Sequence, residues 1–96
     1  MTKHLEHEFK DSLREVDFNH LDGVKYVFIF DNGYGASVIK CSGSYGGRED
    51  LWELAVLKRN DNGEYYIKYN TPITNDVLGY LSDKEVNNYL SQIKEL

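Results

Sequence analysis

The stretch that decides the fold is VKYVFIFDNGYGASVIKCSGSYGGREDLWELAVLKRNDNGEYYIKYN, residues 24–70. It contains strand-like runs at 24–31, 34–41, 51–59 and 64–70. The first two runs meet at Asn32-Gly33 and the last two at Asn62-Gly63. Asn-Gly between β-rich runs is the strongest short-range signal for a hairpin, because tight hairpin turns need positive φ angles at their central residues. The sequence therefore predicts a four-stranded antiparallel β-meander.

A C-terminal helix is predicted over residues 82–95. Ser82 and Glu85 form a capping box, in which each side chain satisfies a backbone N–H at the start of the helix. Apolar side chains then recur at helical spacing, at Val86, Tyr89, Leu90 and Ile93. This stripe should pack on one face of the sheet, so the expected fold class is α+β.

An amphipathic N-terminal helix is also predicted, over residues 3–16. Apolar residues recur there at helical spacing, at Leu5, Phe9, Leu13 and Val16. The stripe is thin, so this helix needs a packing partner for its stability. We expect residues 1–20 to form a helical extension and residues 21–96 to form a single α+β domain.

Composition narrows the class of protein. The chain has 96 residues, 41% hydrophobic and 14% aromatic, and a net charge of −5, which together fit one globular domain. It has no basic stripe, so direct nucleic-acid binding is not expected. Its single cysteine, Cys41, cannot form an internal disulfide. Without a signal peptide or a membrane-length apolar run, we expect a protein of the cytoplasm and no membrane partner.

The sequence shows no catalytic constellation, and we expect no enzyme activity, no metal and no cofactor. His4 and His7 would share a face of the predicted N-terminal helix, but no spacing fixes a third metal ligand beside them. The glycine-rich loop around Gly46-Gly47 leads into a strand, whereas a phosphate-binding loop leads into a helix. Glu53 interrupts an apolar strand, and alternation predicts that it faces solvent.

Binding residues are predicted on two loops and one strand. Tyr45 and Arg48 lie in the longest loop, residues 42–50, and both residue types are favoured at the centres of protein interfaces. Further candidates for partner binding are Tyr34 beside the first turn, and Tyr66 and Lys68 on the fourth predicted strand.

Four sequence blocks resemble a family of small proteins encoded by bacteriophages and prophages. In chain order the blocks are Asn32-Gly33-Tyr34-Gly35, Tyr45-Gly46-Gly47, Glu53-Leu54-Ala55-Val56-Leu57 and Asp76-Val77-Leu78-Gly79-Tyr80-Leu81. The resemblance covers roughly residues 28–96. It implies kinship, and it brings no catalytic or binding residues that could be transferred to this chain.

The resemblance implies a role in phage infection. Small acidic phage proteins without catalytic residues often bind host proteins, which is an analogy rather than an argument from a site. The leading hypothesis is a binding protein of the host cytoplasm that inhibits or modulates a host protein, such as a CRISPR effector of a defence system.

Two alternatives stay open. The run 24–31 is apolar on both faces, which would suit a homodimer or larger homo-oligomer with a structural or assembly role in the phage. The second alternative is a small enzyme that binds a nucleotide or a metal.

Overall fold

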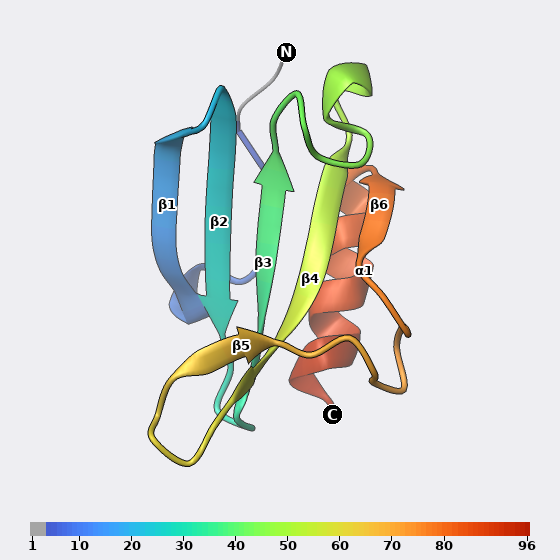
Figure 1. The fold of residues 1–96 in the computed structure, drawn as a ribbon. Coiled ribbons are helices and arrows are strands. Elements are labelled where there is room, and N and C mark those ends of the chain that lie inside the picture. Colours follow the sequence, from blue (N-terminus) through green and yellow to red (C-terminus); the bar gives the residue numbers. More distant parts are fainter. Residues whose placement is uncertain (1–3) are drawn as a thin grey trace.

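The computed structural model describes residues 4–96 and contains one antiparallel sheet with a single α-helix behind it (Figure 1). The strands are β1 (Leu13–His20), β2 (Gly23–Ile29), β3 (Tyr34–Lys40), β4 (Trp52–Arg59), β5 (Tyr65–Ile67) and β6 (Leu78–Leu81). The helix is α1 (Asp83–Lys94), and two short 3-10 turns are η1 (Lys10–Ser12) and η2 (Gly47–Glu49). The order β1-β2-β3-β4-β5 is a meander, and β6 also pairs with β4.

The predicted N-terminal helix over residues 3–16 is wrong. Its first residue lies outside the described part of the chain, and the remainder forms a non-helical arm, η1 and the start of β1. We call residues 4–9 the N-terminal arm. Every second residue of the arm, Leu5, His7 and Phe9, is buried or half-buried, while the residues between them are exposed. This period of two is that of an extended segment.

The sheet is wider than the predicted four strands, so the predicted fold class needs a second correction. β1 was missed because residues 1–20 were assigned to a helical extension, yet it pairs with β2 along the sheet edge. β6 lies between the fourth predicted strand and the predicted C-terminal helix, where no strand was predicted, and it pairs with the first half of β4. The fourth predicted strand, 64–70, shrinks to the three residues of β5.

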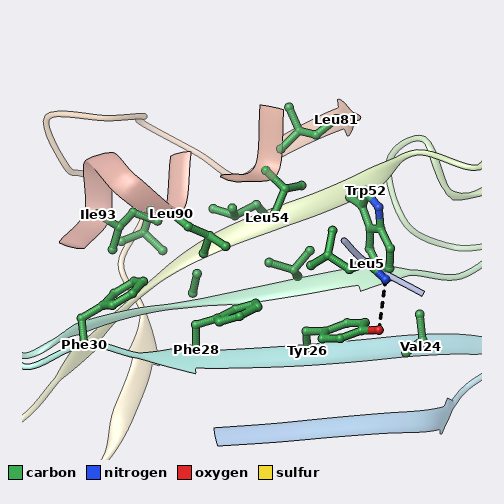
Figure 2. Close-up of a cluster of buried hydrophobic side chains, with 14 residues drawn as sticks. Leu5, Val24, Tyr26, Phe28, Phe30, Trp52, Leu54, Leu81, Leu90 and Ile93 are labelled. Atoms are coloured by element: carbon green, nitrogen blue, oxygen red, sulfur yellow. Dashed lines mark hydrogen bonds between the residues drawn. The ribbon is translucent and has the colours of Figure 1, made fainter. Parts of the chain in front are cut away.

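The core lies between the sheet and α1 (Figure 2). β2 contributes an aromatic row that includes Tyr26 and Phe28, and α1 contributes the predicted stripe of apolar residues. Leu5 of the N-terminal arm enters this core, where its backbone N–H donates to Tyr26 Oη at 3.1 Å (Figure 2). The predicted capping box is confirmed, because Ser82 and Glu85 exchange both of its hydrogen bonds.

Asn32, in the turn between β2 and β3, closes the other end of α1. Its Nδ2 donates to the carbonyl oxygens of Ile93, Lys94 and Leu96, at 2.9, 3.1 and 3.1 Å. Its Oδ1 accepts the N–H of Tyr34 at 3.0 Å. The last carbonyls of a helix lack N–H partners from a following turn. The Asn32 side chain bonds to these carbonyls and also to the turn between β2 and β3.

We expect Asn32→Ala to lower the free energy of unfolding by about 2 kcal/mol, because it removes three hydrogen bonds at the end of α1 and one to the N–H of Tyr34. Urea unfolding measures the loss. Asn60→Ala is the matched control, since Asn60 shapes the turn between β4 and β5 through its own Oδ1 and makes no bond to α1. Equal losses in the two variants would contradict the role of Asn32 at the helix end.

The stability of the protein should fall as His7 becomes protonated. The His7 ring packs against Tyr26 and Phe28, and burial, aided by Lys10, lowers its pKa below the ordinary 6.5. The unfolded chain therefore takes up this proton first, so stability is full above pH 6.5 and is lost as the pH falls through the lowered pKa. Thermal unfolding between about pH 7.5 and 5.5 tests this, above the range where carboxylates titrate. His7→Phe keeps a ring and should flatten the slope; an unchanged slope would refute the assignment to His7.

Candidate functional site

The candidate site is the face of the sheet that turns away from α1. Strand register aligns its side chains in three cross-strand rows. From the Asn32 turn toward the glycine-rich loop, the rows are Ile29-Gly35-Leu57-Ile67, Glu15-Val27-Ser37-Ala55 and Asp17-Lys25-Ile39-Glu53. We call these positions the open face. The open face exists because successive side chains of a strand point to opposite faces of the sheet. The residues on either side of each of these positions along the strand point toward the core.

The open face is apolar at its centre and incompletely covered. α1 lies behind the sheet, on the opposite side (Figure 1). Val27, Ile29 and Ile39 are half-buried, and Ile67 on β5 is 42% exposed. Within residues 4–96, no helix packs over this face. Ala55 and Leu57 on β4 are buried, so the part of the face that another molecule can cover is its β2 and β3 side.

Acidic side chains border this apolar centre. Glu15 and Asp17 stand at the β1 ends of two rows, and Glu53 stands at the β4 end of the row that begins with Asp17. Lys25 is the only basic residue in the rows. Glu53 lies on the face opposite the core, as alternation predicted, but it is half-buried, and its Oε1 accepts the N–H of Tyr45 at 2.9 Å.

Tyr45 and Arg48 lie together in the loop before β4, at the Glu53 end of the open face. Tyr45 is 60% exposed, and Arg48 is exposed with its Nε donating to the carbonyl of Ser42 at 3.2 Å. The carbonyl of Tyr45 accepts the N–H of Tyr80 on β6 at 3.1 Å. Tyr80 is 57% exposed and has a φ of 58°, and it was missed because no strand was predicted in its segment.

Two other predicted residues, Tyr34 and Tyr66, meet at the opposite end of the sheet. They flank Lys58 in one cross-strand row, and Lys58 Nζ lies 4.3 Å from the centroid of the Tyr34 ring. Lys68 follows β5 and donates its backbone N–H to the carbonyl of Val56. The five predicted residues therefore form two groups at opposite ends of the sheet, and the partner-binding role assigned to each stays a prediction.

The two histidines considered for metal binding do not share a face, because the arm is not helical. His4 is exposed against the ring of Phe18, whereas His7 lies against the rings of the core. Among residues 4–96, no group of three or more His, Cys, Asp or Glu side chains is arranged to hold a metal ion. In the same part of the chain, no helix has the length and apolar character needed to span a membrane.

Comparison with known proteins assigns no family. No family model, no curated protein and no solved structure matches this chain. The candidate site therefore rests on the geometry of the chain itself.

Gly79→Ala is expected to push the Tyr45 loop away from β6. A Cβ at residue 79 would lie 2.5 Å from the Tyr45 Cβ, so the two backbones could not keep their present approach. Overpacking of this kind costs about 1–3 kcal/mol. Amide hydrogen exchange at Tyr80 should accelerate. Gly43→Ala in the same loop is the control, because nothing lies within 4 Å of its added Cβ; equal acceleration in both variants would contradict the close packing.

Proposed function

We propose that this chain is a protein-binding domain that covers a surface of a partner protein with its open face. The observation that carries the proposal is the half-buried apolar centre, Val27, Ile29 and Ile39, on the face of the sheet that turns away from α1 and the core. An apolar centre inside a charged border is the usual anatomy of a protein interface. Binding of this kind needs no catalytic group.

Charge indicates the chemistry of the partner. Glu15, Asp17 and Glu53 outnumber Lys25 on the open face, and the whole chain carries a net charge of −5. Two copies placed face to face would bring like charges together, which is costly at an interface. A partner with an apolar patch bordered by Lys or Arg complements the open face in both respects. The charge therefore favours a basic partner over a homo-oligomer.

We further propose that the partner is a host protein in the cytoplasm of an infected bacterium. The support is the resemblance of the four sequence blocks to phage and prophage proteins, together with the acidic border of the open face. Nucleases that act in defence, CRISPR effectors among them, bind nucleic acid through basic surfaces. An acidic domain that occupies such a surface would inhibit the nuclease by exclusion, at one copy per target.

A double variant, Val27→Thr/Ile39→Thr, should weaken binding of the partner roughly 30-fold, about 2 kcal/mol, because it removes apolar contact from the open face. Threonine is β-branched like the residues it replaces, so the strands should persist. The tagged wild-type chain would first capture the partner from bacterial lysate, and titration with the purified partner would then give the affinities.

Phe18→Thr is the matched control, since Phe18 is 42% exposed but contacts Tyr26 on the core side of the sheet. It should bind normally. Unchanged affinity in the open-face variant would overturn the proposal. If only the double variant Tyr45→Ala/Arg48→Ala abolished binding, the interface would be the loop of residues 42–50 and not the open face. A wild-type dimer in sedimentation that the open-face variant dissociates would show self-association instead.

A further inference from the structure

The N-terminal arm is attached to the domain in the way that a bound peptide is attached to its receptor. Its backbone polar groups bond to side chains of the domain and do not extend the ladder of a strand. The N–H of Glu6 donates to Asp83 Oδ2 at 3.2 Å, and the N–H of Glu8 donates to Asn87 Oδ1 at 3.0 Å. Asn87 Nδ2 in turn donates to the carbonyl of Glu6 at 2.7 Å.

The amide of Asn87 therefore holds the carbonyl of one arm residue and the N–H of the residue two positions later. These two groups point the same way only when the segment is extended. Asn87 therefore recognises the extended backbone of the segment and not its side chains. Recognition of an extended peptide commonly combines main-chain hydrogen bonds of this kind with pockets for alternate side chains.

Alternate side chains of the arm pack against the domain, as they would in such pockets. Leu5 is only 6% exposed and lies within the core beside Tyr26 (Figure 2). The ring of His7 lies 5.1 Å from that of Phe28, and the ring of Phe9 lies 5.9 Å from that of Phe30, both edge to face. Glu6 and Glu8 point outward and are exposed. A peptide that fits would need an apolar residue, an aromatic or imidazole side chain two positions later, and an aromatic residue two positions after that.

The receptor side of this contact is held in place by the domain. Asp83 Oδ1 accepts the indole N–H of the fully buried Trp52 at 2.7 Å, which leaves Oδ2 for the arm. Asn87 Nδ2 also donates to the carbonyl of Asp83 at 2.9 Å, one turn back along α1. Both side chains would therefore keep their orientation if the arm left, as binding sites that are formed in advance do.

We propose that the surface formed by Tyr26, Phe28, Asp83 and Asn87 is a peptide-binding site, which the arm occupies in cis and an extended segment of a partner protein can occupy in its place. The site lies on the core side of the sheet, opposite the open face, so it is distinct from the surface of the proposed function. The arm joins β1 only through η1, so its departure breaks no strand pair. The arm defines the ligand, an extended segment with an apolar residue followed at two-residue steps by two ring-bearing residues.

The test uses the full chain and a labelled peptide with the sequence of residues 4–12. The cis arm competes at an effective concentration that is millimolar for a short tether, so the peptide should bind the wild-type chain weakly. Glu8→Pro removes the arm N–H that Asn87 accepts and leaves every receptor side chain in place. We expect at least a ~10-fold gain in peptide affinity in this variant, with saturation at one peptide per chain.

Asn87→Ala in the Glu8→Pro background should then lose peptide affinity by about tenfold, since it removes both main-chain bonds. Trp52 fluorescence and the melting temperature verify that each variant stays folded. The control peptide carries Leu5→Ser and Phe9→Ser and should not bind. Absence of saturable binding to Glu8→Pro and to Glu6→Pro would overturn the proposal, as would binding that Asn87→Ala leaves unchanged. A wild-type dimer that Asn87→Ala disrupts would make the occupant the arm of a second copy and also overturn it.

Discussion

The hydrogen bond from the Trp52 indole to Asp83 is the contact on which the arrangement of the elements depends. A buried indole N–H needs an acceptor, and Asp83, the first residue of α1, supplies it at 2.7 Å. The same carboxylate accepts the N–H of Glu6, so strand, helix and arm meet at one side chain. Above the indole ring, Lys40 Nζ lies 4.2 Å from its centroid and forms an ion pair with Asp50 at 2.9 Å. The loop before β4 is thereby tied to the same point.

Side-chain hydrogen bonds fix both ends of α1 and hold the helix on one side of the sheet. Asp83 fixes the start of the helix against β4, and Asn32 fixes its end against the turn between β2 and β3. The helix is therefore held along one side of the sheet, where it and the arm cover the core residues. With a single helix in residues 4–96, the opposite side keeps only the cover that β5 and the loops provide (Figure 1).

Local signals in the sequence were enough to predict the hairpins and the capping box, because each depends on neighbours in the chain. The role of Asn32 was not predictable in this way, since its partners Ile93, Lys94 and Leu96 lie over sixty residues away. The arm was misjudged because His7 occupies an apolar position of a period-two pattern, which left helical spacing as the visible pattern. The second apolar face of β2 was visible in the alternation of 24–31, but two of its acidic border residues, Glu15 and Asp17, lie on β1, which was not predicted as a strand.

β2 contributes residues both to the open face and to the site that the N-terminal arm occupies. Val27 and Ile29 belong to the open face, whereas Tyr26 and Phe28 point to the arm, because alternate residues of a strand face opposite ways. Loss of the arm would remove contacts from one side of β2 and leave its pairing with β1 and β3 in place. The register that builds the open face would then survive. Because β2 keeps its pairing with both neighbours, loss of the arm should leave the arrangement of the open face unchanged. Because the two proposed surfaces lie on opposite faces of the sheet, a partner at one would not obstruct a partner at the other.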